Sequence, residues 1–475
     1  MSSIIEIDKI KSKCQKLTPD TLVETMLNLA EYTTGLMGKT ILENSFGSGS
    51  ILKEIVVRYI RDALKSGYDL QTISQGLSHD IYGIELDKEL YDKCLIELDR
   101  IVNSFEIPVV KWNLFNEDAL GLNLDIQFDY IVGNPPFISY NEMNDDSRKR
   151  LQENYETCST GKFDYCYAFI ELGINYLNST GKLVQLIPNN IFKNVFAQKL
   201  RDKLKPHIST IYDYPNQKFF DKTSTSVSLF LYEENNYSET VEYKNQTSGK
   251  ENLINRDSLN GKWTFSDLNS KDGKTIRFGD IFHASAAVAT LCNQAFLVSQ
   301  DVILEEEIES GVLYKAASPK TLKHQQKKQI VFPYKYTESG LGRYSAVEFE
   351  NLFPNTTMHL KKFKNELKSR NSDANAAWFE YGRSQALTHL NTEKLLLSTV
   401  ITKAVEVYKI DEKTVPFAGI YITIKDNNYS LDDAISILKS EQFLKYVCTI
   451  GVNVSGKSLR ITCKDINEYC FVGGQ

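Results

Sequence analysis

Residues 134–137, Asn-Pro-Pro-Phe, combine groups suited to holding a planar amine. The apolar residues 130–132 before them are typical of a buried strand, which Gly133 ends. Two successive prolines fix φ and supply no N–H donor, so the backbone leaves the strand on a rigid path. This path presents the amide oxygen of Asn134 beside a bare backbone carbonyl, with an aromatic ring directly after them. The pattern indicates a receptor for a planar group that carries an NH2, or else a Pro-Pro turn that only caps the strand.

A strand, a Gly-x-Gly turn and a helix are expected in succession over residues 40–59. Glu43 ends the strand, and Gly47 and Gly49 precede the helix, where glycines let a ligand approach the backbone. Leu52 stands where a dinucleotide fingerprint needs its third glycine. The pattern therefore favours a nucleotide-type site without a pyrophosphate or triphosphate loop.

Two further carboxylates follow predicted strands. Residues 81–85 end in Glu85, placed to accept hydrogen bonds from ribose hydroxyls, before a helix over 89–101. A third strand region ends near residue 116, and Asp118 behind it offers an acceptor for an adenine amino group. Ligands of α/β sheets bind at the carboxyl ends of strands, so these groups predict a nucleoside ligand.

The rest of the first half completes a doubly wound α/β domain. A helix start is expected at residues 17–21, with Thr18 or Asp20 as cap candidates. A long helix is predicted over 163–177, and further strands over 181–188, 208–212 and 226–232. The sheet should be mostly parallel and seven-stranded, and the step from 118 to 134 needs a bare loop. A polar run over 233–238 predicts a boundary between domains 1–238 and 239–475.

Composition bounds the class of protein. The chain has 475 residues and a net charge of −6, and its acidic excess lies in residues 1–240. Residues 320–370 are rich in lysine and arginine, which suits a polyanionic partner or a solvated helix face. No signal peptide and no apolar run of about 18 residues is found, which predicts a soluble cytoplasmic protein without a membrane partner. The eight cysteines form no C-x-x-C pair, which indicates reduced core thiols and no metal site.

With these residues assembled, the first half resembles the amino-group DNA methyltransferases, specifically the adenine-N6 enzymes of the TaqI-like type. The resemblance implies a Rossmann-like, S-adenosyl-L-methionine-dependent catalytic domain and a C-terminal α+β target-recognition domain. It assigns the catalytic tetrad to Asn134, Pro135, Pro136 and Phe137. It assigns cofactor binding to Thr18, Glu43, Gly47, Gly49, Glu85, Asp118 and Asn134. Phe46 departs from the family, which often has a small residue there, and this departure predicts a methionine pocket that is either crowded or reshaped.

The chemistry of the tetrad is consistent with this resemblance. An exocyclic amine on a purine is a poor nucleophile because its lone pair is delocalised into the ring. Acceptance of its hydrogens by Asn134 and by the Pro135 carbonyl would free the lone pair toward a methyl donor. A duplex adenine must be flipped out to reach this pocket, and Phe137 and Phe220 would stack on it. Phe220 is equally compatible with a core position, and the sequence does not decide between Phe219 and Phe220.

The second half carries weaker signals. Residues 283–298, 331–335 and 378–385 resemble segments of the target-recognition domain of the same family. Arg383 and Gln385 are residue types that contact base edges or phosphates. The aromatic run before them is also good core material.

Residues 451–458 have the full spacing of a phosphate-binding loop. The following residues alternate like a strand, whereas such a loop should open a helix. We therefore interpret Lys457 and Arg460 as candidate DNA-backbone contacts and not as an ATP site.

The expected activity is methyl transfer to the N6 of adenine in double-stranded DNA by a monomer, with a possible separate restriction endonuclease as partner. Alternatives are a methyltransferase acting on RNA or on a protein glutamine amide, and a non-catalytic DNA-recognition subunit. A fused restriction–modification polypeptide is disfavoured because the cofactor segment begins by residue 18.

Overall fold

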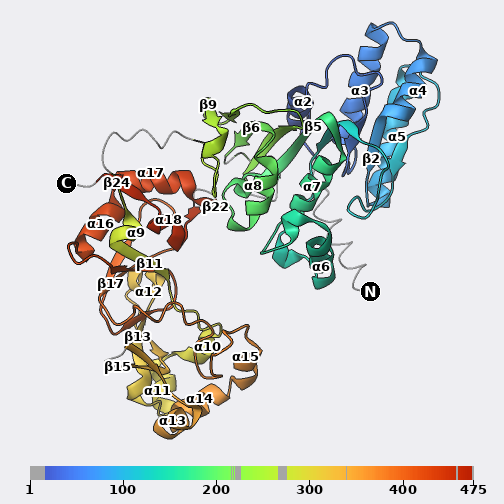
Figure 1. Ribbon diagram of the computed structural model, residues 1–475. Coiled ribbons are helices and arrows are strands. Elements are labelled where there is room, and N and C mark those ends of the chain that lie inside the picture. Colours follow the sequence, from blue (N-terminus) through green and yellow to red (C-terminus); the bar gives the residue numbers. More distant parts are fainter. Residues whose placement is uncertain are drawn as a thin grey trace. The chain divides into compact units, whose positions relative to one another are not determined.

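The computed structural model describes residues 17–215, 217, 219, 226–265, 275–337, 340–455 and 458–472. The chain forms two compact units, residues 1–266 and 267–475 (Figure 1). The first unit extends past the expected boundary at residue 238 because the hairpin of β8 and β9 joins its sheet.

The first unit is built on a nine-stranded sheet of order β3-β2-β1-β4-β5-β7-β6-β8-β9. The seven predicted strands are present, and β8 and β9 extend the sheet at one edge. The pairs among β1 to β5 are parallel, whereas β7 is antiparallel to both neighbours. The strands are β1 (Ile41–Glu43), β2 (Ile81–Ile84), β3 (Asn113–Phe115), β4 (Phe128–Gly133), β5 (Leu177–Pro188), β6 (Ile208–Tyr214), β7 (Val227–Glu233), β8 (Thr240–Asn245) and β9 (Lys250–Asn255).

Helices cover both faces of this sheet. Neighbouring strand residues alternate between two apolar cores, as Ile131 and Val132 do, which is expected of a strand buried on both sides. One core takes the helices α2 (Asp20–Leu29), α3 (Ser50–Lys65), α4 (Leu70–Asp80) and α5 (Lys88–Ser104). The other takes α6 (Asp145–Asn154), α7 (Cys166–Tyr176) and α8 (Gln198–Leu204). This arrangement confirms the predicted Rossmann-like α/β fold.

The carboxyl ends of β1 to β4 meet at one edge of the sheet because these strands are parallel. The bare loop predicted between residues 118 and 134 is present: no helix separates β3 from β4. Glu43, Glu85, Asp118 and Asn134 all follow or end these four strands. The topology thus places these predicted site residues at one edge of the sheet.

The second unit combines small sheets with short helices, as expected for an α+β domain. Its sheets have the orders β11-β21-β17-β19, β12-β14-β13-β20, β18-β23-β22, β10-β24 and β15-β16. The strands are β10 (Thr275–Arg277), β11 (Phe282–Ala286), β12 (Leu297–Val298), β13 (Leu313–Ala317), β14 (Lys328–Val331), β15 (Tyr334–Thr337), β16 (Gly340–Arg343), β17 (Lys394–Leu397), β18 (Val400–Ile401), β19 (Val407–Ile410), β20 (Thr414–Pro416), β21 (Ile420–Ile424), β22 (Val452–Ser455), β23 (Ser458–Arg460) and β24 (Cys470–Val472). The helices are α9 (Phe278–Ile281), α10 (Asn293–Phe296), α11 (Gln300–Glu305), α12 (Pro319–Lys323), α13 (Ala346–Leu352), α14 (Pro354–Lys361), α15 (Lys364–Ser369), α16 (Leu431–Lys439), α17 (Glu441–Ile450) and α18 (Cys463–Asn467).

The segment with phosphate-loop spacing lies in a hairpin. β22 and β23 pair antiparallel, and β23 also pairs with β18. Residues 458–460 therefore form a strand, as the alternating pattern predicted, and not the helix that a phosphate-binding loop precedes. Gly456 and Lys457 lie outside the described residues.

Within the described part of the chain, no helix combines the length and the apolar character needed to cross a membrane. Of the described cysteines, Cys94, Cys158 and Cys166 are buried free thiols, whereas Cys448 and Cys470 are exposed. The expectation that the cysteines are core thiols therefore fails for these last two.

Candidate functional site

A cavity of about 380 Å³ opens at the carboxyl ends of the central strands. It is lined by four of the predicted site residues, Thr18, Glu43, Gly47 and Asn134. The other lining residues are Leu17, Ser45, Phe46, Ser48, Ser50, Asp87, Glu89, Leu90 and Lys93. Its lining carries three acidic side chains and one lysine, and the lysine pairs with Glu89 at 2.7 Å, so acidic groups outnumber basic ones.

The glycines of the loop before α3 have distinct roles. Gly49 caps the helix with a φ of 81°, and a Cβ there would lie 2.3 Å from the Cys94 Sγ. Only glycine fits both the left-handed backbone and this close approach. Gly47 has a φ of 55° with open space around it, and its N–H donates to the Glu85 Oε2 at 2.8 Å. The Gly-x-Gly pattern thus shapes a loop that one carboxylate ties down.

Glu43 is buried at the end of β1, and its Oε2 receives no hydrogen bond. Burial, reinforced by the nearby Glu85 carboxylate, raises the pKa of Glu43 well above its ordinary value. A buried acceptor without a protein partner costs free energy, and a ligand that donates to it removes this cost. Glu43 is therefore suited to a ligand that carries a donor or a positive charge.

Glu85 does not line the cavity. Its Oε1 accepts from the Asp87 N–H at 2.7 Å and its Oε2 from Gly47, so the carboxylate braces the cavity wall. Burial raises the pKa of Glu85, while these backbone donors oppose that shift. Each oxygen retains a second lone pair, so the predicted ribose contact stays a prediction.

Asp118 also lies outside the cavity lining. Its Oδ2 accepts from the Arg150 Nη1 at 2.7 Å and its Oδ1 from the Leu120 N–H at 3.0 Å. Arg150 lies on α6, a helix that sequence periodicity did not predict. The predicted adenine acceptor is thus held by an arginine that no motif identified.

Asn134 faces the cavity from the end of β4. Its Nδ2 donates to the Thr18 Oγ1 at 3.1 Å, and its backbone carbonyl lies 3.5 Å from the Ser45 Oγ. The expected cap role of Thr18 or Asp20 is wrong: Pro19 is the N-cap of α2, and the cap makes no side-chain hydrogen bond. Thr18 is instead a buried neighbour of Asn134.

The remaining tetrad residues form the rigid exit from β4. Phe137 is half-buried and packs against both apolar cores. Phe219 packs edge-on against Tyr214 with ring centroids 5.1 Å apart. Phe220, the predicted second stacking residue, lies outside the described residues.

Phe46 lines the cavity, but most of its side chain lies in the apolar core. It is only 3% exposed and lies with its ring 6.0 Å from that of Tyr91. Gly83 makes room for it, since a Cβ at Gly83 would lie 2.8 Å from the Phe46 ring. The core therefore accommodates the Phe46 ring, and the predicted effect on the methionine pocket stays a prediction.

Sequence reasoning missed several residues of the cavity. Ser45, Ser48 and Ser50 belong to the polar loop that carries the two glycines, so that loop was a usable signal. Glu89 and Lys93 belong to the first turns of α5, where helical spacing alone resembles an ordinary solvated face.

Two segments predicted to act in target recognition meet in the second unit. Ala289 and Arg383 form an isolated antiparallel bridge, and the Gly382 N–H donates to the Thr290 carbonyl. Arg383 pairs with Asp373 at 3.0 Å, and Gln385 is exposed beside it. The aromatic run before them is core material, because Phe379 and Tyr381 are buried.

The other predicted DNA contacts do not join this loop. Arg460 is exposed on β23 of a different sheet, and Lys457 lies outside the described residues. In the lysine-rich stretch, Lys361 pairs with Glu350 and Lys362 with Glu306. These two lysines fit the solvated helix face that was weighed against a polyanion surface.

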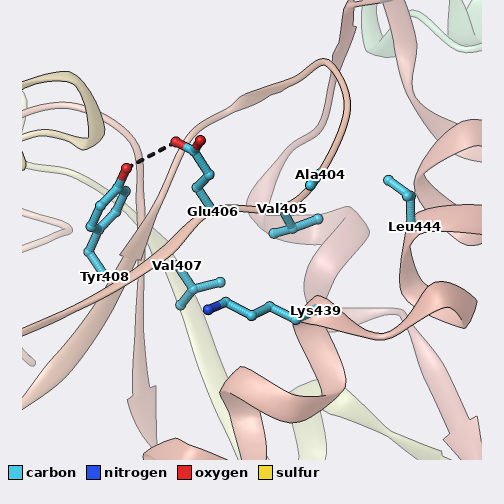
Figure 2. Close-up of a pocket in the computed structure, with 7 residues that line it drawn as sticks. All are labelled: Ala404, Val405, Glu406, Val407, Tyr408, Lys439 and Leu444. Carbon is cyan, nitrogen blue, oxygen red and sulfur yellow. Dashed lines mark hydrogen bonds between the residues drawn. The ribbon is translucent and has the colours of Figure 1, made fainter. Parts of the chain in front are cut away.

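A second cavity, of about 460 Å³, lies in the second unit (Figure 2). Its lining residues come from the approach to β19, from β19 itself and from α16 and α17: Ala404, Val405, Glu406, Val407, Tyr408, Lys439 and Leu444. Tyr408 donates to Glu406, and Figure 2 shows this pair. No residue proposed from the sequence lines this cavity.

Comparison with known proteins agrees with the first unit's geometry. Residues 64–220 match the model of the Eco57I restriction-modification methylase family. This segment contains Glu85, Asp118 and the whole tetrad. The chain resembles the methyltransferases of type II restriction–modification systems.

Two relatives illustrate the extent of this resemblance. The type II methyltransferase M.BstVI of Geobacillus stearothermophilus is 26% identical over 240 residues, which cover 47% of this chain and 42% of that protein. The type II restriction enzyme and methyltransferase RM.Eco57I of Escherichia coli is 22% identical over 509 residues, covering 83% of this chain and 50% of that protein. The chain thus spans about half the length of the curated relatives it matches.

The fold extends to both units in a solved structure. The type IIL restriction-modification enzyme MmeI, determined in complex with DNA, superposes with a TM-score of 0.60 at 12% identity, covering 98% of this chain and 65% of that chain. The predicted S-adenosylmethionine-dependent methyltransferase fold with an additional C-terminal domain is confirmed.

Proposed function

We propose that this protein is a DNA methyltransferase that transfers a methyl group from S-adenosyl-L-methionine to the N6 of an adenine flipped out of duplex DNA. We further propose that it provides the modification activity of a restriction–modification system. The observation that carries the proposal is the Asn134 carboxamide at the rim of an acidic cavity, at the end of the strand that precedes two prolines.

The cavity suits the chemistry of this cofactor. When bound, S-adenosyl-L-methionine supplies an electrophilic methyl group on a positively charged sulfur. The unpaired Oε2 of Glu43 and the acidic lining favour a ligand with cationic groups. Ser48 precedes α3 and Ser50 begins it, and their hydroxyls can donate hydrogen bonds to a carboxylate. Glu85 and Asp118 would hold the ribose and adenine ends.

Asn134 and Pro135 would activate the acceptor. The Asn134 Oδ1 and the Pro135 carbonyl would accept hydrogen bonds from the target amine and thereby localise its lone pair. Phe137 would stack on the flipped base, which offsets about 1–3 kcal/mol of unstacking. No strong base is needed. The amine proton becomes acidic as the new N–C bond forms, so a weak base suffices to remove it.

Target recognition would reside in the second unit. The loop at 383–385 presents an arginine and a glutamine at the surface, both suited to base edges and phosphates. That MmeI has this two-unit fold and was determined with DNA supports the proposal.

One assay tests the acceptor. The pure protein is incubated with labelled S-adenosylmethionine and, in parallel, with plasmid DNA, bulk RNA and cell protein, with Asn134→Ala as the control. We expect label in DNA only, and about 10²-fold less or lower still with the variant. Label confined to RNA or protein would contradict the DNA assignment.

A further inference from the structure

Thr18 is placed where a side chain has no local structural task. It is buried directly before α2, yet Pro19 is the N-cap and the helix start makes no side-chain hydrogen bond. A threonine hydroxyl buried in this way needs a partner. Its partner is the Asn134 side chain, 116 residues later in the chain.

The contact anchors the Asn134 carboxamide at the wall of the cavity. The Asn134 Nδ2 donates to the Thr18 Oγ1 at 3.1 Å, and no described residue donates to the Oδ1. The oxygen is therefore left as an acceptor, which is the atom an amine substrate needs. Because a threonine hydroxyl both accepts and donates, Thr18 anchors the carboxamide in either orientation.

We propose that Thr18 is a positioning residue for methyl transfer, which holds the Asn134 carboxamide in place at the cavity for the acceptor amine. The inference rests on the proposed function. Thr18 also lines the cofactor cavity, so its hydroxyl touches the two halves of the site. A positioning role affects turnover, whereas a purely cofactor-binding role affects affinity for S-adenosylmethionine.

Two substitutions separate these roles in the full chain. Thr18→Val keeps the shape and removes the hydroxyl, whereas Thr18→Ser keeps the hydroxyl. We expect Thr18→Val to lower kcat on DNA by about tenfold, the value of one hydrogen bond, with Kd for S-adenosylmethionine changed less than about threefold. Thr18→Ser should restore kcat to within about threefold of wild type.

A double-mutant cycle tests whether Thr18 acts through Asn134. In an Asn134→Ala background, Thr18→Val should have no further effect on the residual rate, because the group it orients is gone. An unchanged kcat in Thr18→Val, or a loss confined to cofactor affinity, would overturn the inference.

A spectroscopic measurement does not depend on activity. With 15N-asparagine labelling, the Asn134 side-chain amide signals are identified by their absence in Asn134→Ala. They should shift in Thr18→Val and stay in place in Thr18→Ser. Unchanged signals in Thr18→Val would overturn the contact itself. If Thr18→Val shifts these signals but the wild-type protein methylates nothing, the contact between Thr18 and Asn134 stands and the proposed function is contradicted.

Discussion

The cavity of the first unit and the surface loop at 383–385 of the second unit both carry polar residues predicted from the sequence, but they use their polar atoms differently. In the cavity, the Oε2 of the buried Glu43 has no protein partner. In the loop, the Arg383 guanidinium and the Ser384 hydroxyl are both held by Asp373. A buried acceptor without a protein partner that lines a cavity is open to a donor on a ligand, whereas a paired surface residue must exchange partners on binding.

The largest effect should come from the cavity's reacting edge. Asn134→Ala removes the acceptor that acts only in the transition state, so we expect the methylation rate to fall by about 10²–10³-fold or more. Kd for S-adenosylmethionine, measured by calorimetry, should stay within about tenfold of wild type. A large loss of cofactor binding would instead show that Asn134 acts in cofactor binding and not only in the transition state.

The glycine loop should be the next most sensitive feature. Gly49→Ala forces a Cβ to within 2.3 Å of the Cys94 Sγ in a left-handed backbone. We expect the free energy of unfolding to fall by about 2–4 kcal/mol in denaturant titrations. Gly47→Ala is the matched control, since it has positive φ but open space, and should lose only about 1–2 kcal/mol. Equal losses would mean that the Cys94 contact is unimportant.

Glu43→Gln tests whether the unpaired carboxylate serves a ligand. We expect affinity for S-adenosylmethionine to fall by about tenfold, because a glutamine cannot form the carboxylate that a cationic ligand would stabilise. The folded state holds the proton of Glu43 more tightly than the unfolded state, so ionisation of Glu43 destabilises the cofactor-free protein as the pH rises above about 4.5.

The same substitution therefore predicts a pH-dependent gain in stability. Without cofactor, Glu43→Gln should melt at a higher temperature than wild type at neutral pH, and the difference should shrink as the pH falls toward 4.5. A variant that is less stable at neutral pH would show that the carboxylate is satisfied in the free protein.

The smallest effect is expected in the second unit. Arg383→Ala should weaken DNA binding by only about fivefold in fluorescence anisotropy. The effect is small because Arg383 already pairs with Asp373 in the free protein. Asp373→Asn should tighten binding by releasing that arginine. An Arg383→Ala variant that binds DNA like wild type would remove this loop from the recognition surface.

The same contrast explains what could be predicted from the sequence. The sequence predicted that four residues at strand ends lie near one another: Glu43, Glu85, Asp118 and Asn134. This was possible because the carboxyl ends of parallel strands meet at one edge of the sheet. The contact between Thr18 and Asn134 could not be predicted from the sequence, because it joins the side chains of residues 116 positions apart. Arg150 on Asp118 was missed for the same reason.

The boundary between the two units was predicted too early for a physical reason as well. The polar run at 233–238 reads as a linker, but β8 after it pairs in parallel with β6. The two strands are distant in the sequence, and an alternating pattern does not indicate with which strand a segment pairs.

The central claim is tested most directly by identifying the modified nucleoside. DNA incubated with the protein and S-adenosylmethionine is digested to nucleosides and analysed by mass spectrometry, with the Asn134→Ala protein in parallel. We expect N6-methyldeoxyadenosine with the wild-type protein and about 10²-fold less or lower still with the variant. Methylation of cytosine, or N6-methyldeoxyadenosine made equally by the variant, would contradict the account.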